Sequence, residues 1–360
     1  MQCLKVCHMT SNHSPEDIRI FHKECVSLAK AGYQVYLVER GETYDKDGVH
    51  IIGIGSTPAN PIKRMLESAK KVYRAALSVD ADIYHFHDPE LLPYGLKLKK
   101  RGKKVIFDSH EDFPAQMKDK PWLPGWVRNT VSSVYRKYET RVVRRIDAVV
   151  TATSHIAEQF TGRAGKIAVV NNYPKLDDIV FHDSPFTDRA PMVCYAGGIN
   201  ELRGEKIMIE AMEQVDGTLI IAGEHEKAQI GDKVKYVGKL DRAGVNDLYS
   251  RAVAGLCILK PIENYYYSQP IKMYEYMAAG IPFICSDFPG WRTTADESGA
   301  GICVDPANVP EIRKAIVSLL SDREKAQKMG INGRNYVISH CSWSGEEKKL
   351  LHLYQSMKDA

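Results

Sequence analysis

Short apolar runs rich in β-branched residues alternate with stretches of helical periodicity along almost the whole chain. This alternation is typical of parallel β-sheets whose strands are joined by crossover helices. The 360 residues are too many for one ordinary core and suit two such domains. The sequence therefore predicts an α/β protein of two tandem, doubly wound, Rossmann-like domains, with a ligand cleft between them at the carboxyl ends of the strands.

The predicted strands fall into two sets, separated by a polar, proline-containing break at 183–191. The first set is Leu4–Cys7, Val35–Val38, Ile51–Ile54, Ile83–His87, Val105–Asp108, Ala148–Thr151 and Ile167–Val170. The second set is Met192–Ala196, Thr218–Ala222, Val234–Val237, Ala254–Leu259, Pro282–Cys285 and Ile302–Val304. We therefore expect a first domain over 1–185, a second over 186–343, and a C-terminal helix over 344–360 that packs back on the first domain.

The composition is that of a globular protein, with 44% hydrophobic and 26% charged residues. The N-terminus passes directly into a strand pattern without the features of a secretory signal, and no apolar run is long enough to cross a bilayer. The eight cysteines lack paired metal-type spacing and are predicted to be reduced, buried thiols. A cytoplasmic location is expected.

Positive charge is concentrated in the first half of the chain, although the formal net charge is only +4. Basic and apolar residues alternate in Lys63–Arg74, Lys97–Lys104 and Arg128–Arg145. Such faces bind anionic lipid or are simply solvated, and the two tryptophans of Pro121–Trp126 favour a membrane interface. Peripheral binding to an anionic membrane is thus one hypothesis and a solvated surface the other. No nucleic-acid partner is expected, because no recognised binding motif accompanies the charge.

The segment 263–280, ENYYYSQPIKMYEYMAAG, combines groups that suit a nucleoside diphosphate. Ser268 and Pro270 are typical of a turn that opens a helix, Lys272 adds a cation in the first turn, and Glu275 follows three residues later. Backbone N–H groups at a helix start attract anions, and a carboxylate can accept two hydrogen bonds from vicinal sugar hydroxyls. The alternative is a capped amphipathic helix whose lysine and glutamate are solvated.

A second phosphate-binding pattern occurs in 192–206, MVCYAGGINELRGEK. Gly197 and Gly198 at a strand end let the backbone approach a ligand closely, and Arg203 adds a planar cation. A tight turn alone would also explain the two glycines. Because this segment and 263–280 belong to the same predicted sheet, together they predict a diphosphate site.

Two polar clusters follow predicted strands of the first domain: HFHDPE at 85–90 and DSHED at 108–112. Both should lie at the carboxyl edge of the sheet, where a histidine can hold a sugar hydroxyl or move a proton near neutral pH. His110, His87 and Glu111 are the candidates. The alternative is that these residues cap helices and bond to strand-end backbone.

The segment 8–24, HMTSNHSPEDIRIFHKE, opens the first helix. Ser14 is predicted to cap that helix, since serine followed by proline and acidic residues is a common helix start. Asp17 and Arg19 are candidates to bind the acceptor or to gate the site.

With these motifs, the chain resembles the family 4 glycosyltransferases, which are retaining enzymes with the two-domain GT-B fold. The resemblance covers nearly the whole chain. It rests on the Ser-x-Pro-x-Lys-x-x-Glu-Tyr-Met-Ala-Ala-Gly run ending at Gly280, the strand 281–287 after it, the His-Asp-Pro-Glu-Leu-Leu run at His87–Leu92, and Asp17-Ile18-Arg19.

The resemblance implies that the first domain binds the acceptor and the second a nucleotide sugar, taken by default as a UDP-sugar, with a glycan or lipid-linked acceptor. It also implies that Glu275 contacts the ribose, that Arg203 and Lys272 contact the diphosphate, and that His110 lies beside the donor sugar. The fixed cations can stabilise the leaving diphosphate, so no metal or other cofactor is expected. The predicted residues are His110, Arg203 and Lys272 for catalysis, Gly197, Gly198, Ser268 and Glu275 for the donor, and Asp17, Arg19, His87 and Glu111 for the acceptor.

The chain departs from the family pattern at two points. The first glutamate of the family's Glu-x7-Glu pair falls at Tyr267, and the arginine that often follows the phosphate-loop glycine is replaced by Gly198-Ile199. Three alternatives therefore stay open: a non-catalytic nucleotide-sugar-binding module, a nucleotide-sugar epimerase, and a metal-dependent hydrolase. The hydrolase would use His85, His87, Asp88, His110 and Glu111.

Overall fold

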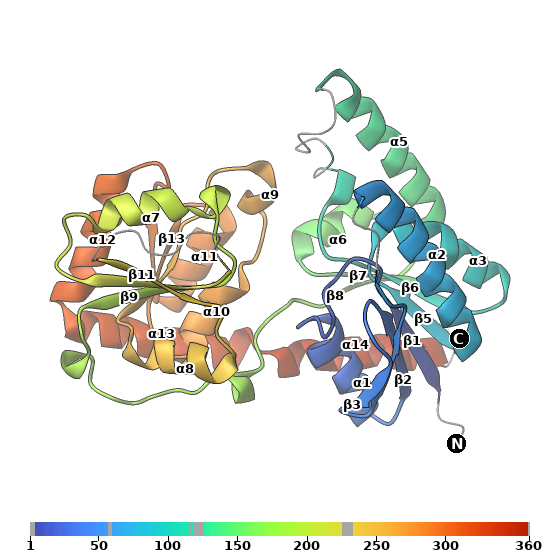
Figure 1. Ribbon diagram of the computed structural model, residues 1–360, viewed down its shortest axis with the longest axis horizontal. Helices are drawn as coiled ribbons and strands as arrows, with labels where there is room; N and C mark the ends of the chain where they lie inside the picture. The colour runs from blue at the N-terminus through green and yellow to red at the C-terminus, as the bar shows by residue number, and fades with distance from the viewer. Residues whose placement is uncertain (1–3, 57–59, 115–116, 118–124, 225–232, 359–360) are drawn as a thin grey trace. The chain divides into compact units, whose positions relative to one another are not determined.

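The computed structural model describes residues 4–56, 60–114, 117, 125–224 and 233–358 (Figure 1). The chain divides by its contacts into two compact units, which are Met1–Asn172 with Glu346–Ala360, and Tyr173–Gly345. The segment 173–185, expected in the first domain, groups with the second unit. No helix in the described part of the chain is long and apolar enough to span a membrane.

Unit 1 is built on an eight-stranded sheet. Its strands are β1 (Lys5–Met9), β2 (Gln34–Glu39), β3 (Tyr44–Lys46), β4 (Val49–Gly53), β5 (Ile83–Phe86), β6 (Lys104–Ser109), β7 (Ala148–Thr151) and β8 (Ile167–Val169). They lie in the order β3-β4-β2-β1-β5-β6-β7-β8, and all neighbours are parallel except β3 and β4. Every residue of β5 and β7 is buried, as expected for strands covered on both faces.

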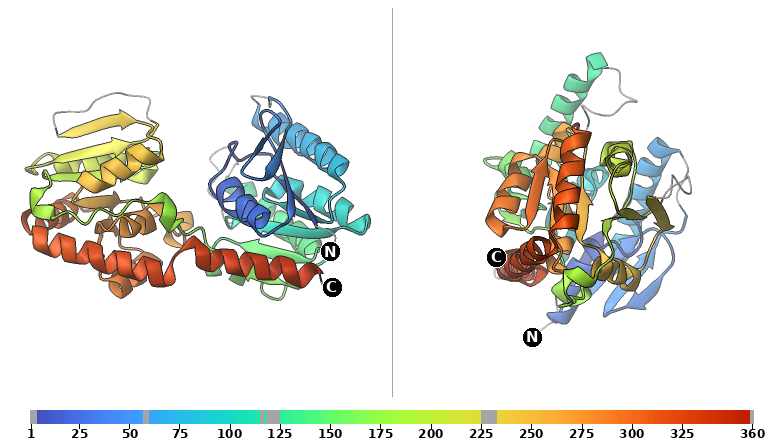
Figure 2. Two further views of the ribbon diagram at one scale, coloured as in Figure 1. Left: turned by 90° about the horizontal axis from the view of Figure 1, so that it is seen from below. Right: turned by 90° about the vertical axis from the view of Figure 1, so that its left-hand side faces the viewer.

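The helices of unit 1 connect these strands and cover the sheet. They are the π-helical η1 (Ile20–Cys25), α1 (Val26–Lys30), α2 (Pro61–Val79), the 3₁₀-helical η2 (Pro89–Leu91), α3 (Leu92–Lys100), α5 (Gly125–Val143) and α6 (Ser154–Phe160). The C-terminal helix α14 (Trp343–Lys358) completes the unit (Figure 2). Its Tyr354 is fully buried and bonds to His8 of β1 and His85 of β5, so α14 covers one face of this sheet.

Unit 2 is built on a six-stranded, all-parallel sheet in the order β11-β10-β9-β12-β13-β14. The strands are β9 (Met192–Ala196), β10 (Thr218–Ala222), β11 (Val234–Gly238), β12 (Ala254–Cys257), β13 (Phe283–Ser286) and β14 (Gly301–Val304). The helices are η3 (Leu176–Asp178), η4 (Phe186–Asp188), η5 (Glu201–Arg203), α7 (Glu205–Met212), α8 (Arg242–Arg251), α9 (Glu263–Tyr266), α10 (Ile271–Ala278), α11 (Pro289–Ser298), α12 (Val309–Ser321) and α13 (Arg323–His340). Among its described residues, one apolar cluster fills the interior.

These topologies confirm the predicted fold class, and every predicted strand is present within two residues of its expected bounds. The short β3 was not predicted. It has no apolar alternation and forms only by antiparallel pairing with β4. The strand order reverses between β1 and β5 in unit 1 and between β9 and β12 in unit 2, and sheets of this kind bind ligands at the carboxyl ends of such strands.

Candidate active site

Two glycines follow β9 and bring its backbone next to two cations. Gly197 has a φ of +130°, a conformation that favours glycine, and a Cβ atom there would lie 3.5 Å from Lys272 Nζ. A Cβ atom on Gly198 would lie 2.6 Å from Nη1 of Arg203. The predicted Gly-Gly turn, Arg203 and Lys272 are therefore neighbours, although 75 residues separate the first glycine from the lysine.

Neither cation forms an ion pair with a carboxylate among the residues that the structure describes. Nζ of Lys272 lies 3.8 Å from the centre of the Tyr195 ring, and Nη1 of Arg203 donates to the Gly198 carbonyl at 2.9 Å. Burial and the positive charge of Arg203 lower the pKa of Lys272 to about 8. Two unpaired positive charges held this close attract an anion.

Glu275 lies one turn after Lys272 on α10 and is held by two residues of α8. Its Oε1 accepts a hydrogen bond from Arg242 Nη2 at 2.9 Å, and its Oε2 accepts one from the Tyr249 hydroxyl at 3.2 Å. Each carboxylate oxygen has two lone pairs, so capacity for further donors remains. Sequence reasoning missed Arg242 and Tyr249 because they belong to no recognised motif.

Ser268 fixes the turn between α9 and α10. Its hydroxyl donates to the Tyr265 carbonyl at 2.9 Å, and its own carbonyl accepts from Trp291 Nε1 at 2.7 Å. Pro270 is the N-cap of α10, and among the described residues no side-chain hydrogen bond caps this helix. Met273 N–H donates to the Pro270 carbonyl at 3.1 Å, and the N–H groups of Ile271 and Lys272 lie in the first turn, where a helix offers no intrahelical acceptor. Tyr267, at the position of the family's first glutamate, is 53% exposed.

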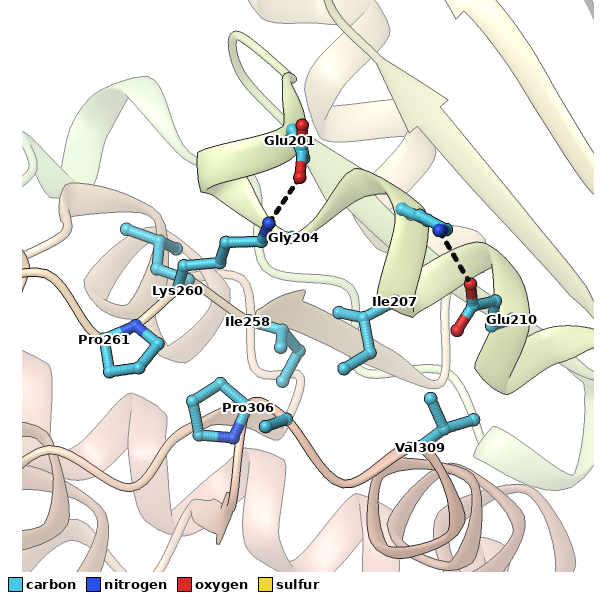
Figure 3. Close-up of a pocket in the computed structure, with 12 residues that line it drawn as sticks. Glu201, Gly204, Ile207, Glu210, Ile258, Lys260, Pro261, Pro306 and Val309 are labelled. Carbon is cyan, nitrogen blue, oxygen red and sulfur yellow. Dashed lines mark hydrogen bonds and ion pairs between the residues drawn. The ribbon is translucent and has the colours of Figure 1, made fainter. Parts of the chain in front are cut away.

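A cavity of about 300 Å³ lies in unit 2 between α7 and the loops that follow β12 and β14 (Figure 3). Ile207, Ile258 and Val309 contribute apolar walls, and ion pairs join Glu201 to Lys260 at 2.6 Å and Lys206 to Glu210 at 3.8 Å at its border. Although η5 contributes both to this cavity and to the cation pair, none of the predicted site residues lines it.

Asp108 is the centre of the polar cluster at the carboxyl ends of β1, β5 and β6. Arg19 donates to both of its oxygens, from Nε and from Nη2, each at 3.0 Å. His110 Nε2 lies 3.2 Å and His87 Nδ1 3.3 Å from Asp108 Oδ2. Burial opposes ionisation of Asp108, but Arg19 and the two histidines hold its pKa well below the usual range.

Arg19 and Asp17 both form hydrogen bonds within unit 1. Arg19 is only 3% exposed, and its Nη1 donates to the Val170 carbonyl at 2.7 Å, so its guanidinium is used inside unit 1. Arg19 therefore orients Asp108, and the acceptor contact stays a prediction. Asp17 Oδ1 accepts from the backbone N–H groups of Arg19 at 2.8 Å and Ile20 at 3.1 Å, so Asp17 caps this helix where Ser14 was expected to do so.

Of the predicted histidines, only His110 reaches the surface. Its side chain is 18% exposed, whereas His87 is 2% exposed and burial lowers its pKa to about 4. His87 Nε2 lies 2.9 Å from His8 Nδ1, and His87 Nδ1 lies 3.2 Å from His110 Nε2, inside the unit. The acceptor contact of His87 stays a prediction. Glu111 is exposed beside His110.

His13 is a neighbour of His110 that sequence reasoning did not single out. Their ring centres are 4.8 Å apart, and His13 Nδ1 lies 3.1 Å from Asp88 Oδ1. Asp88 also accepts from the Ser11 backbone N–H at 2.6 Å and the Thr10 hydroxyl at 2.8 Å. Burial alone would raise the pKa of Asp88, but these partners lower it to about 2.

The ligand set of the hydrolase hypothesis is not assembled in the described structure. The Asp88 carboxylate accepts hydrogen bonds from Thr10 and Ser11, which follow β1, and the Glu111 side chain is exposed. The groups that could share an ion are instead His87 with Asp108 and His110, and His8 with Glu24, His85 and His87.

The basic segments differ in their exposed apolar side chains and in their ion pairs. In α2, Met65 and Leu66 are 42% and 61% exposed, and in α5, Trp126 and Val134 are 86% and 62% exposed. In α3, by contrast, Lys99 pairs with Asp147 at 2.7 Å. Residues 121–124 of the predicted tryptophan segment lie outside the described residues.

Two family models match the chain in succession. The model described as "Glycosyltransferase Family 4" matches residues 19–173, and that described as "Glycosyl transferases group 1" matches residues 177–336. Among curated proteins, the chain is similar to the glycogen synthase of Mycobacterium tuberculosis, with 24% identity over 258 residues that make up 65% of this chain and 60% of that protein. The match thus spans about three fifths of that relative's length.

Solved structures share the fold over nearly the whole chain. The sucrose-phosphate synthase from Thermosynechococcus elongatus superposes with a TM-score of 0.79 at 17% identity, covering 99% of both chains. HepE from Anabaena, solved in complex with UDP-glucose, gives a TM-score of 0.71 at 11% identity, covering 98% of this chain and 100% of the other.

Proposed function

The chain belongs to the family 4 glycosyltransferases with the GT-B fold, and from this premise we propose that it transfers a hexose from a nucleoside-diphosphate sugar to a glycan or lipid-linked acceptor, with retention of configuration. The observation that carries the proposal is the unpaired cation pair Arg203 and Lys272 beside Gly197-Gly198 in unit 2. Such a site suits the diphosphate of the donor.

Cleavage of the bond between the sugar and the phosphate places negative charge on the leaving diphosphate. Arg203, Lys272 and the N–H groups at the start of α10 would stabilise that charge without reorganising, which lowers the barrier to transfer. Fixed side chains of the protein thus supply the positive charge, and we propose that transfer needs no metal ion.

Glu275 is proposed to accept hydrogen bonds from the ribose hydroxyls of the donor. Arg242 and Tyr249 hold its two oxygens and keep the carboxylate in one orientation. The complex of HepE with UDP-glucose supports a UDP-sugar as the first donor to test.

Unit 1 is proposed to supply His110, which positions the sugar during transfer. An ionised carboxylate only accepts hydrogen bonds, so Asp108 fixes the hydrogen of His110 on Nε2, and Arg19 in turn fixes Asp108. Asp17 and Glu111 are proposed to contact the acceptor.

We further propose a cytoplasmic protein that binds reversibly to anionic membrane through α2 and α5. The exposed apolar side chains Met65, Leu66 and Trp126 beside basic residues support this location.

Nucleotide binding and turnover test the proposal in two steps. UDP, GDP and ADP are screened for thermal stabilisation of the chain, because a ligand that prefers the folded state raises the Tm. The stabilising nucleotide's sugars are then assayed for release of free nucleoside diphosphate with glycan or lipid-linked acceptors. If no nucleoside diphosphate stabilises the chain, the donor site is wrong.

Binding without release would favour a non-catalytic module, the alternative that Tyr267 in place of a glutamate supports. An altered sugar recovered without acceptor would identify an epimerase.

A further inference from the structure

Three histidines and one glutamate meet inside unit 1, away from solvent. His8 of β1 and His85 of β5 are register partners on neighbouring parallel strands, and His87 follows two residues later, so the three imidazoles lie on one face of the sheet. Glu24 of η1 reaches the same place. None of these four residues is more than 2% exposed.

Their donor atoms are close enough to share one ion. One side-chain nitrogen or oxygen from each of the four lies within 4.8 Å of those of the other three. His8 Nδ1 is 2.9 Å from His87 Nε2, while Glu24 Oε2 is 4.0 Å from His8 Nδ1 and 3.9 Å from His85 Nδ1. Donors around tetrahedral Zn²⁺ at about 2.0–2.1 Å stand about 3.4 Å apart, so each of these three distances would change by about half an ångström.

Two of the four residues have unsatisfied polar atoms. Among the described residues, no donor forms a hydrogen bond to either carboxylate oxygen of Glu24. His85 Nε2 also has no partner, whereas His85 Nδ1, the nitrogen 3.9 Å from Glu24 Oε2, bonds to the Tyr354 hydroxyl at 2.8 Å. Arg19 Nε lies 3.1 Å from Glu24 Oε1, but its N–H is directed to Asp108. A fully buried carboxylate without a donor is costly, and a cation would satisfy it.

The surroundings of the histidines are those of metal ligands. A histidine that binds a metal usually donates its second ring N–H to a carboxylate or another oxygen, which fixes the ring. His87 Nδ1 lies 3.3 Å from Asp108 Oδ2, and His8 Nε2 lies 3.1 Å from the Tyr354 hydroxyl. Two of the three imidazoles thus have such a partner on the side away from the cluster.

We propose that His8, Glu24, His85 and His87 form a structural site for a divalent transition-metal ion of the Zn²⁺ class. Imidazole and carboxylate donors suit that class, and four protein ligands close the coordination shell. Because the cluster is buried, the ion contacts no substrate. It joins β1, β5 and η1 and stabilises unit 1, and the proposal does not depend on the transferase activity.

The test uses the full chain, stripped with a chelator and dialysed. Zn²⁺ alone is titrated by calorimetry, and Co²⁺ alone by visible absorption, which reports tetrahedral coordination. We expect one ion per chain and a Tm raised by about 5–10 °C at a hundredfold excess over Kd. Failure of the chain to bind Zn²⁺, or Co²⁺ bound without tetrahedral bands, would overturn the proposal.

Variants separate this site from surface binding. Glu24→Gln keeps the side-chain volume and should weaken Zn²⁺ binding more than about a hundredfold, and Tyr354→Phe should weaken it about tenfold through the orientation of His8. The control is His50→Gln, since His50 lies exposed 2.5 Å from Asp45 and could hold a surface ion. The His50→Gln chain should bind Zn²⁺ with unchanged affinity. Loss of uptake in His50→Gln, or unchanged affinity in a folded Glu24→Gln chain, would contradict the site.

Discussion

Replacing Lys272 with methionine should abolish most transfer while making the folded chain more stable. The ammonium group is only partly exposed and has no ion-pair partner among the described residues. Its pKa of about 8, compared with 10.5 in water, corresponds to a cost of about 3–4 kcal/mol for keeping it charged, at about 1.4 kcal/mol per pKa unit. Lys272→Met removes that cost, so the Tm should rise rather than fall.

The same change removes a cation from the leaving diphosphate. Loss of one preorganised electrostatic contact costs about 3–4 kcal/mol in the transition state, so kcat/KM for the donor should fall about 10²–10³-fold. The assay is release of nucleoside diphosphate at subsaturating donor, with a parallel thermal melt. Lys239→Met is the matched control, because Lys239 is 75% exposed and pairs with Glu224, and a surface pair contributes little.

The pKa of Lys272 also predicts a pH dependence. Because kcat/KM reports the free enzyme, its value should fall as the pH rises through about 8 and the ammonium loses its proton. Between pH 8 and 10.5 the unfolded chain binds this proton and the folded chain does not, so the free energy of unfolding should rise with pH relative to Lys272→Met. A Lys272→Met chain whose kcat/KM stays within about threefold of that of the parent chain, or whose Tm is lower than that of the parent chain, would refute this account of the site.

Four other outcomes are expected. Glu275→Gln should weaken binding of the stabilising nucleotide about 10–100-fold by calorimetry, because charge-assisted hydrogen bonds to ribose are lost; an unchanged Kd would reject the ribose contact. His110→Ala should lower kcat for transfer more than it changes nucleotide Kd, and the reverse pattern would move His110 to the nucleotide site. Asp108→Asn should lower the free energy of unfolding in urea by about 3–5 kcal/mol, because the buried Arg19 loses the carboxylate that accepts from both its Nε and its Nη2; a loss below about 1 kcal/mol would argue against that pair. Anionic vesicles should sediment the chain at low but not high salt, whereas equal binding to neutral vesicles would contradict an electrostatic surface.

The sequence predicted the strands well because buried parallel strands are continuous apolar runs. The same runs locate the carboxyl edge of each sheet, and they therefore predict that Lys272 lies near Gly197 and Arg203 although about 70 residues separate them. The missed strand β3 depends on a tertiary contact with β4 and has no periodicity of its own.

Side-chain partners were harder to predict than positions. Arg19 belongs to a family-like motif, yet its guanidinium donates hydrogen bonds to Asp108 and to the Val170 carbonyl inside the unit. Glu275 was identified from its motif, but Arg242, which holds it, lies 33 residues away on another helix. Periodicity and spacing show which residues share an edge, and they do not show which of them satisfy one another.

The chain leaves unit 1, builds unit 2, and returns to finish the first sheet's covering with α14. Glu346 accepts the Asn171 backbone N–H at 2.8 Å, and Tyr354 fills the space over His8 and His85. On the ribosome, the whole of unit 2 is therefore synthesised before unit 1 has all of its parts. At about 5–20 residues per second, the part of the first sheet that Tyr354 covers, over His8 and His85, stays without α14 on the order of ten to thirty seconds or more. Chaperones that shield apolar surface would therefore bind the N-terminal half of the nascent chain. This half contains most of unit 1, the unit whose synthesis starts first and ends last.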